Sequence, residues 1–354
     1  MAPCATLPSE ERLLALVDRM AGQPIAMLVD LVADRFITGT PKRISREAPV
    51  LILSYEGEML TPGGGANAVA NVAALGGRPL PLGVVGDDPH GRELTAALAE
   101  RGVETSGILT RAGFRTPTKV RILGGGRHSI KQQIVRYDIE DHLTLSAGER
   151  LALTSRLAAW GADEGVRVAI LSDYGYGAVE PGLLPEVRQV LGPVAILVGD
   201  SRYRLGEFAG LDGATPNLEE AEALLGGSLE GEGDRLGAGG RRLLERLGTR
   251  FLLITRGSRG MSLFTAEAPD RPAHLPVHGA DQVADVTGAG DTVIGTFALA
   301  LAAGATPLEA ALLGNYAGGV VVMKMGTATL SPDELKRAVR SDPRPREESQ
   351  WARS

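Results

Sequence analysis

The stretch DVTGAGDTVIGTFALALA, residues 285–302, places a glycine-rich turn directly before an apolar helix. Glycines let the backbone turn tightly and approach a ligand closely. The helix that follows directs unpaired N–H groups and the positive end of its dipole toward that turn. Such a site binds phosphate, and it stabilises a phosphoryl group that gains charge in a transition state. The stretch therefore predicts an anion site formed by Gly288, Ala289 and Gly290.

Asp291 lies in the first turn of this predicted helix. A carboxylate there is placed to take a proton from an attacking hydroxyl, as in phosphoryl transfer. The alternative is an ordinary glycine loop in which Asp291 only caps the helix. The local pattern supports both interpretations about equally, so the choice depends on the rest of the chain.

A second glycine-rich stretch, PGGGANAVANVA, spans residues 62–73. The glycines at 63–65 are expected to open a helix that continues to about residue 75. Asn67 and Asn71 share a face of that helix, and the Asn67 amide can hydrogen-bond a polyol in two directions. The alternative is a helix start whose Asn side chains only satisfy local backbone. The stretch also fits the loose dinucleotide fingerprint, but residues 56–62 separate it from a predicted strand at 50–55, which disfavours a nucleotide-cofactor oxidoreductase.

The rest of the chain predicts an α/β body. From residue 147 onward helices and strands alternate, which is typical of a mainly parallel sheet covered on both faces. We expect a single domain at 22–340, a glycine-rich loop at 226–240 and a disordered tail at 341–354. The expected helices are 9–21, 63–75, 91–101, 147–160, 181–191, 218–225, 234–247, 291–303 and 307–323, with Ser9 and Thr306 as N-caps of the first and the last. The expected strands of the body are 25–29, 81–85, one near 108, 167–171, 194–198 and 250–255.

Two extended segments, 34–60 and 117–140, interrupt this alternation. Residues 117–123 and 129–139 predict a hairpin around the glycines at 124–126. A small separate sheet would leave unpaired edges, which a homodimer that shares it would cover. We expect these segments to form a β lid that excludes water from a ligand.

The composition of the 354-residue chain excludes several classes of function. The net charge of −6, with no basic block, disfavours nucleic acid and anionic membranes as partners. Cys4 is the only cysteine, so an intrachain disulfide is excluded. The sequence contains no Gly-Lys pair and hence no Walker A loop, and Pro276 separates His274 from His278, which disfavours a helical metal site. The apolar run 292–303 is too short to span a bilayer, and we expect a cytoplasmic protein.

Together, the two glycine-rich stretches resemble the two signatures of the ribokinase-like (PfkB) carbohydrate kinases, in that family's order and at its usual separation. The resemblance covers about residues 24–330. Within the family, the chain is most similar to the kinases of D-glycero-D-manno-heptose 7-phosphate. The stretches that carry this likeness are DRF at 34–36, RISREAPV at 43–50, QQIVRYDIE at 132–140, SDY at 172–174, TPNL at 215–218 and KMGTAT at 324–329.

The resemblance implies a ribokinase-like three-layer sandwich with a small β lid. It also implies an ATP- and Mg²⁺-dependent kinase that phosphorylates a sugar or sugar phosphate, with heptose 7-phosphate as the first expectation. Asp291 would be the catalytic base, and K⁺ would bind near Asp285 and Thr287. Arg136 is the first candidate to hold the phosphate that the substrate already carries, with Lys119 and Arg43 behind it. Sugar hydroxyls would be held by Asp34, Gly63, Gly64 and Asn67. The nucleotide would be held by Asn217, Glu220, Thr255, Gly257, Gly260 and Asn315, with Glu220 acting indirectly on Mg²⁺.

Each of these positions also has a structural explanation. Asn217 fits a helix N-cap, Thr255 the end of a strand, and Arg136 a solvated strand residue. The chain departs from the family pattern at Val29, where a Gly is usual, at Tyr176, where we expect a Lys, and at 200–202, which read Asp-Ser-Arg rather than Asp-Pro-Lys. The alternatives are a kinase of an unphosphorylated sugar and a non-catalytic ligand sensor, and the presence of Asp291 with its glycine loop disfavours the sensor.

Overall fold

Strand β1 (Pro24–Val29) shows why the body of the protein has three layers. In the computed structural model, which describes residues 8–126, 131–230, 234–279 and 284–342, Ile25 and Met27 face one hydrophobic core, whereas Ala26 and Leu28 face another. All four side chains are at most 3% exposed. Because successive side chains of a strand point to opposite faces, this strand is covered on both sides.

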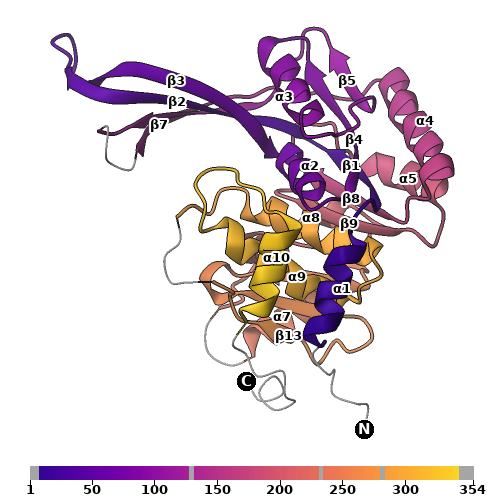
Figure 1. The fold of residues 1–354 in the computed structure, drawn as a ribbon. Coiled ribbons are helices and arrows are strands. Elements are labelled where there is room, and N and C mark those ends of the chain that lie inside the picture. The colour runs from indigo at the N-terminus through magenta and orange to yellow at the C-terminus, as the bar shows by residue number, and fades with distance from the viewer. Residues whose placement is uncertain (1–7, 127–130, 231–233, 280–283, 343–354) are drawn as a thin grey trace.

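The central sheet has nine strands within the described ranges, in the order β13-β12-β11-β10-β9-β8-β1-β4-β5 (Figure 1). Strands β12 and β13 run antiparallel to their neighbours and the other pairs are parallel, which confirms the predicted mainly parallel sheet. The strands besides β1 are β4 (Arg78–Gly86), β5 (Ile108–Arg111), β8 (Val168–Asp173), β9 (Ile196–Ser201), β10 (Gly213–Ala214), β11 (Phe251–Thr255), β12 (Met261–Thr265) and β13 (Ala273–Leu275).

Helices cover both faces of this sheet, as the alternating pattern predicted. The predicted N-caps Ser9 and Thr306 accept hydrogen bonds from the first turns of α1 and α9, respectively. The core that contains Ile25 and Met27 is completed by α1 (Glu10–Arg19), α2 (Gly65–Ala74), α3 (Pro89–Ala99), α8 (Ala289–Ala302), α9 (Pro307–Val321) and α10 (Pro332–Arg340). The opposite core is completed by α4 (Ala147–Glu164), α5 (Leu184–Leu191), α6 (Leu218–Leu225) and α7 (Arg235–Leu247).

A second, smaller sheet projects from the body as an arm (Figure 1). Its order is β3-β2-β6-β7, and β2 follows β1 after the single residue Asp30. The predicted hairpin is confirmed, since β6 and β7 pair in antiparallel fashion. The prediction of a separate small sheet is therefore also confirmed, and we call this sheet the lid. Its strands are β2 (Leu31–Ile44), β3 (Leu51–Gly64), β6 (Thr118–Gly124) and β7 (Gln132–Ile139).

The glycines at 63 and 64 end a strand rather than open a helix, which corrects the sequence prediction. Strand β3 continues to Gly64, whose φ is +51°, and α2 begins at Gly65. A side chain at Gly63 would not fit, because its Cβ would lie 2.5 Å from Oδ2 of Asp34. Strand β3 does run directly into a helix, but it belongs to the antiparallel part of the lid. The parallel βαβ setting of a dinucleotide fingerprint is therefore not met here.

The helix predicted at 234–247 is confirmed as α7, so the loop predicted at 226–240 is wrong where the two predictions overlap. Helix α7 begins at Arg235, and the Asp234 side chain caps it by accepting a bond from the Gly237 backbone. Its glycines allow close packing, since a Cβ on Gly240 would lie 2.1 Å from the ring of Phe264. Helix α10 and strands β10, β12 and β13 had no counterpart in the sequence prediction. Most of the tail predicted to be disordered, from residue 343 onward, lies outside the described residues.

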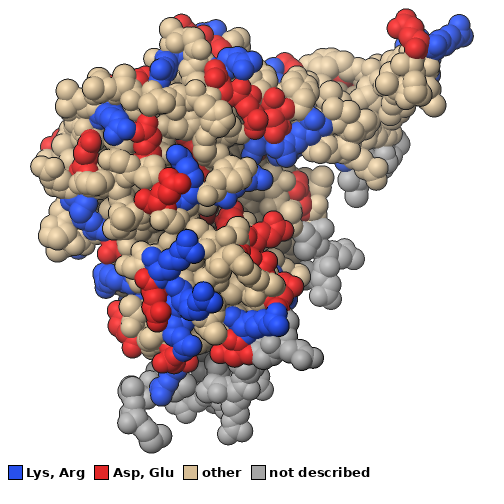
Figure 2. Space-filling model, turned by 180° about the vertical axis from the view of Figure 1, so that it is seen from behind, with Lys and Arg blue, Asp and Glu red and all other residues tan. Residues whose placement is uncertain are grey.

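The surface carries both charges. Figure 2 shows Lys and Arg interspersed with Asp and Glu over one face, while the lid carries few charged residues between its base and its tip. Among the helices of the described ranges, none is both long enough and apolar enough to cross a membrane.

Candidate active site

Asp291 is the third residue of α8 and is 4% exposed. Gly288, whose φ is +76°, occupies the N-cap position, so the interpretation of Asp291 as the helix cap is wrong. The N–H groups of the first turn of α8 begin at the predicted glycine loop, as expected for an anion site. A buried carboxylate therefore lies beside this helix start.

Two side chains donate hydrogen bonds to the Asp291 carboxylate. The Tyr174 hydroxyl donates to Oδ1 over 2.6 Å, and Nδ2 of Asn67 donates to Oδ2 over 3.2 Å. Asn67 Nδ2 also lies 3.2 Å from the carbonyl oxygen of Gly288, and Asn71 Nδ2 donates to Oδ1 of Asn67 over 3.2 Å. Asn67, predicted to hold sugar hydroxyls, thus connects α2 to the glycine loop at 288–290 and to Asp291.

The electrostatic surroundings suit Asp291 for proton transfer near neutral pH. Burial raises the pKa of Asp291 to about 6, although the bonds from Tyr174 and Asn67 and the charge of Lys119 act to lower it. Lys119 lies on β6 with its Nζ 5.2 Å from the centroid of the Tyr174 ring, and burial lowers the pKa of Lys119. A general base is most effective when its pKa lies near the working pH.

The base of the lid contains a buried ion pair that sequence reasoning missed. Asp34 on β2 is 2% exposed and its Oδ1 accepts a hydrogen bond from Arg121 on β6, which is 8% exposed. The Arg121 guanidinium also lies 5.4 Å from the centroid of the Phe36 ring. Asp34, predicted to bind a sugar hydroxyl, therefore has one oxygen engaged by Arg121. The alternation along β6, which places Arg121 on the face of Lys119, was the available signal.

Arg136, the main candidate for reading a substrate phosphate, is already paired. Its Nε donates to Oδ1 of Asp138, two residues along β7, over 2.8 Å, and its side chain is 40% exposed. In the register of the lid it lies opposite Arg121. Arg43, a weaker candidate for the same role, is exposed near the far end of β2. Lys119 is therefore the predicted phosphate reader that lies nearest to Asp291.

The loop before α8 is held by Asp285. Its Oδ1 accepts from the Thr287 N–H over 2.9 Å and its Oδ2 from the Gly326 N–H over 3.0 Å. Burial acts to raise the pKa of Asp285, but these hydrogen bonds outweigh it, so the pKa lies below its ordinary value. In the part of the chain that the structure describes, no three His, Cys, Asp or Glu side chains form a metal cluster. K⁺ binding near Asp285 and Thr287 stays a prediction.

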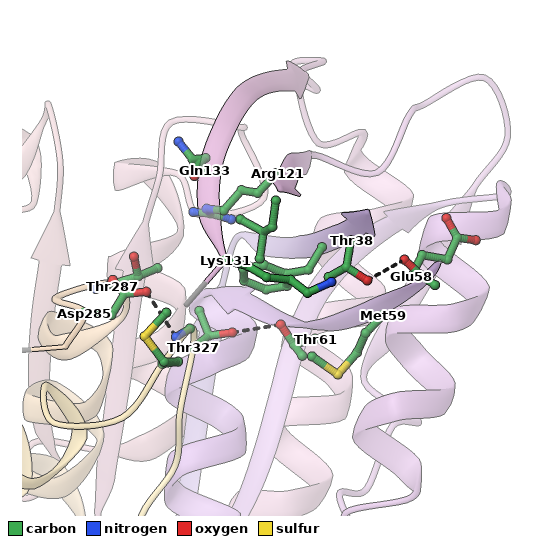
Figure 3. A pocket seen from close by; sticks show the side chains of 15 residues that line it. Thr38, Glu58, Met59, Thr61, Arg121, Lys131, Gln133, Asp285, Thr287 and Thr327 are labelled. Atoms are coloured by element: carbon green, nitrogen blue, oxygen red, sulfur yellow. Dashed lines mark hydrogen bonds between the residues drawn. The ribbon is translucent and has the colours of Figure 1, made fainter. Parts of the chain in front are cut away.

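A cleft of about 620 Å³ lies between the lid and the loops at 285–287 and 325–327 (Figure 3). The hydroxyls of Thr61 on β3 and Thr327 lie 2.8 Å apart and connect the two sides (Figure 3). The lid contributes Phe36, Thr38, Gly57, Glu58, Met59, Thr61, Arg121, Leu123 and Gln133, with Lys131 just before β7. The opposite side is formed by Asp285, Thr287, Met325, Gly326 and Thr327.

The residues predicted to bind the nucleotide gather at the ends of β10, β11 and β13. Asn217 caps α6 and forms a reciprocal capping box with Glu220, so the structural explanation of this pair is correct. The Thr255 N–H donates to the carbonyl oxygen of Pro216 over 3.0 Å. Gly257 and Gly260 shape the turn after β11, with φ of +57° and +77°.

Asn315 joins this group from α9. It is 2% exposed, and its Nδ2 donates to the carbonyl oxygen of Pro276 over 2.8 Å, just after β13. A Cβ on Gly260 would lie 1.9 Å from the carbonyl oxygen of Leu275, so this turn and the end of β13 are in close contact. These residues therefore lie close together, and their binding of a nucleotide stays a prediction.

Sequence reasoning also missed two buried carboxylates near this site, Asp30 and Asp200. Asp30 is 1% exposed, accepts three backbone N–H bonds from residues 174–178, and has a pKa that burial raises to about 6. Burial and the charges of Glu220 and Asp291 raise the pKa of Asp200 well above its ordinary value. Both residues lie at the carboxyl ends of parallel strands, β1 and β9, which flank β8, and α/β sheets bind ligands at this edge. That rule was the available signal.

Comparison with known proteins identifies the family. The pattern that describes the pfkB family carbohydrate kinases matches residues 28–144 and 206–334. The bifunctional protein HldE of Mesorhizobium japonicum is 39% identical over 334 residues, which are 94% of this chain and 65% of that protein. The bifunctional protein HldE of Azotobacter vinelandii is 40% identical over 325 residues, or 92% of this chain and 65% of that protein. The chain thus spans about two thirds of the length of these relatives.

Solved structures agree on the fold. Ribokinase of Arabidopsis thaliana, complexed with ribose and ATP, superposes with a TM-score of 0.69 at 18% identity, covering 91% of this chain and all of that one. Phosphofructokinase-2 of Escherichia coli, in complex with fructose-6-phosphate, gives 0.68 at 18% identity over 90% of this chain and 98% of that one. The predicted ribokinase-like fold is confirmed, and the chain belongs to the pfkB family of carbohydrate kinases.

Proposed function

We propose that this protein transfers the γ-phosphoryl group of ATP to D-glycero-D-manno-heptose 7-phosphate and forms the 1,7-bisphosphate. The observation that carries the reaction type is the buried Asp291 carboxylate at the start of α8, beside the glycine loop. The substrate is supported by the heptose-kinase-like stretches of the lid and by identities of 39% and 40% to bifunctional proteins HldE over more than nine tenths of this chain.

Asp291 performs the proton transfer in this proposal. The sugar hydroxyl gives its proton to the Asp291 carboxylate while its oxygen forms a bond to the γ-phosphorus. The bond from that phosphorus to the bridging oxygen breaks, and ADP leaves with the electron pair. The N–H groups at 288–290 stabilise the charge that develops on the transferred group.

Mg²⁺ fits the acidic residues beside this site. Asp200 and Glu220 both have raised pKa values, chiefly because they are buried, and each is influenced by nearby negative charge. A divalent ion close to such carboxylates would relieve this repulsion, and oxygen ligands are those that Mg²⁺ prefers. Mg²⁺ supplies charge neutralisation for the phosphates when it is bound. We expect no turnover in excess chelator, and activity restored by added Mg²⁺.

K⁺ near Asp285 and Thr287 is supported only by the family resemblance. We expect a higher rate in K⁺ than in Na⁺ buffer at equal ionic strength. Equal rates in the two buffers would remove this part of the proposal.

The lid is proposed to cover the sugar and to pair with a second copy of the chain. Its outer surface exposes large apolar side chains, including Tyr55 at 65% and Tyr137 at 49%. Covering such residues stabilises an association between chains. We also propose a cytoplasmic location, because the reaction consumes ATP.

A kinase of an unphosphorylated sugar is the second candidate, and two observations favour it. Arg136 is already paired with Asp138, and Tyr176 replaces the expected Lys. The test compares heptose 7-phosphate with unphosphorylated heptose on wild type, on Arg136→Ala and, as the control, on Lys42→Ala, an exposed residue of β2 with no predicted role. We expect kcat/KM for the phosphorylated sugar to fall at least tenfold in Arg136→Ala alone, since bonds to charged groups contribute about 1.5–3 kcal/mol. Equal use of both sugars, unchanged by Arg136→Ala, would establish the second candidate.

A further inference from the structure

Tyr174 connects the end of β8 to the Asp291 carboxylate. It follows Asp173, the last residue of β8, and its hydroxyl donates to Oδ1 of Asp291 over 2.6 Å. Asn67 Nδ2 donates to the other oxygen, so both oxygens have a donor from the protein. Each carboxylate oxygen accepts more than one hydrogen bond, and a substrate hydroxyl can therefore still approach.

The backbone that carries Tyr174 is held by Asp30. The Asp30 carboxylate accepts from the N–H groups of Tyr174, Tyr176 and Ala178 over 2.8, 3.0 and 3.0 Å. Asp30 itself is 1% exposed and follows the last residue of β1. Three donors that converge on one buried carboxylate fix the course of the loop. The backbone position of Tyr174 is therefore fixed by Asp30, at the end of a central strand.

The Tyr174 ring also has a defined place. Lys119 lies 5.2 Å from its centroid, and a Cβ at Gly64 would lie 3.3 Å from its edge. The ring thus lies between the start of α2 and strand β6 of the lid. These neighbours restrict the orientation of the ring and hence the position of the hydroxyl that bonds Asp291.

We propose that Tyr174 is a positioning residue for the phosphoryl-transfer reaction, whose hydroxyl holds the Asp291 carboxylate in one orientation and favours its ionised form. The inference rests on the proposed role of Asp291 as the base. A hydrogen bond donated to the charged form of an acid stabilises that form. Burial and the charge of Asp291 raise the pKa of Tyr174 well above its ordinary value, so the phenol keeps its proton throughout.

Other charged groups act on the pair from neighbouring elements, and a Phe at position 174 leaves all of them in place. Lys119 favours the ionised form of Asp291, whereas Asp34 and Asp200 disfavour it. A change in pH dependence therefore reports the lost hydrogen bond. The groups concerned are Asp30 after β1, Asp34 on β2, Lys119 on β6, Asp200 on β9 and Arg202 after β9.

The kinetic test compares Tyr174→Phe with Tyr176→Phe. Tyr176 lies in the same loop and bonds Glu140 over 3.3 Å rather than Asp291, so it is the matched control. We expect the acid limb of kcat/KM to move upward by about one pH unit in Tyr174→Phe only. The rate would then fall about fivefold near pH 6 but within about twofold near pH 8. An unmoved limb in Tyr174→Phe would overturn the proposal.

A spectroscopic test needs no turnover and leaves the hydroxyl in place. 3-Fluorotyrosine is incorporated at position 174 of the full chain, and its ¹⁹F signal is followed from pH 5 to pH 8. We expect a titration step near the Asp291 pKa of about 6, which disappears in Asp291→Asn. A signal that does not titrate, or a step that persists in Asp291→Asn, would overturn the role of Tyr174. Full turnover by Asp291→Asn would instead overturn the proposed function, so the two failures are distinguishable.

Discussion

The base and the tip of the lid belong to the same strands but have opposite surroundings. At the base, Asp34 and Arg121 are 2% and 8% exposed and form an ion pair near Asp291, the proposed general base. Near the tip, Ile44 and Tyr55 are 66% and 65% exposed. Charge is therefore buried at the end of the lid that lies nearest to Asp291, and apolar surface is exposed at the end that lies farthest from the body. The proposed roles of the two ends can be separated by mutation.

The largest expected effect is at the buried end, from Asp291→Asn. We expect turnover to fall by roughly 10²–10⁴ because the general base is lost. ATP affinity, measured by calorimetry, should stay within a few-fold of wild type. Burial raises the folded-state pKa of Asp291, so its ionisation above about pH 6 opposes folding, and the variant should unfold at an equal or higher temperature. Turnover within a few-fold of wild type would remove Asp291 from this role.

Breaking the ion pair at the base should strongly destabilise the fold. Arg121→Ala leaves Asp34 as an uncompensated buried charge, and removing one partner of such a pair typically costs about 3–5 kcal/mol. The matched change at the exposed end, Arg43→Ala, should stay within about 0.5 kcal/mol. Denaturant unfolding of both variants measures this difference. If both variants lost the same free energy of unfolding, the ion pair at the base of the lid would contribute no more than an exposed arginine near the tip.

The pH dependence of kcat/KM should be determined by Asp291, at the buried end of this comparison. Since Asp291 must be ionised to accept a proton and its pKa is raised to about 6, kcat/KM should fall below that pH, about tenfold per unit. An exposed carboxylate would give a limb near pH 4 instead. A rate profile from pH 4.5 to pH 8 distinguishes the two.

The smallest effect on a single chain is expected at the tip. Tyr55→Ser should change the free energy of unfolding by no more than about 0.5 kcal/mol, because the side chain is exposed. It should weaken the proposed homodimer, which light scattering over a range of concentrations would show. A wild-type protein that is monomeric at all concentrations would contradict the proposed dimer.

The sequence predicted the parts of this molecule that depend on local chemistry. The glycine loop at 288–290, the caps at Ser9 and Thr306 and the separate lid sheet each have a signature within a few residues of the element itself. The short strands β10, β12 and β13 do not, because a strand of two to five residues is defined by its neighbours in the sheet.

The sequence analysis missed some site residues for the same reason, because their contacts come from distant parts of the chain. Tyr174 lies 117 positions before Asp291, and Arg121 lies 87 positions after Asp34. Such pairs exist only once the sheet order brings strand ends together, and no spacing within the chain encodes that order. The structure also corrected local interpretations in which helix and strand compete, as at Gly63 and Gly64, which end β3.

The single residue between β1 and β2 has a mechanical consequence. Asp30 connects the last residue of β1 in the central sheet to the first residue of β2 in the lid. Its carboxylate also holds the loop that begins at Tyr174. The residue at which the lid joins the body therefore also holds the backbone of Tyr174, whose hydroxyl donates to Asp291. Strand β3 of the lid also runs directly into α2, which carries Asn67, so a load applied at the tip, such as the docking of a second chain, is expected to alter the alignment at Asp291.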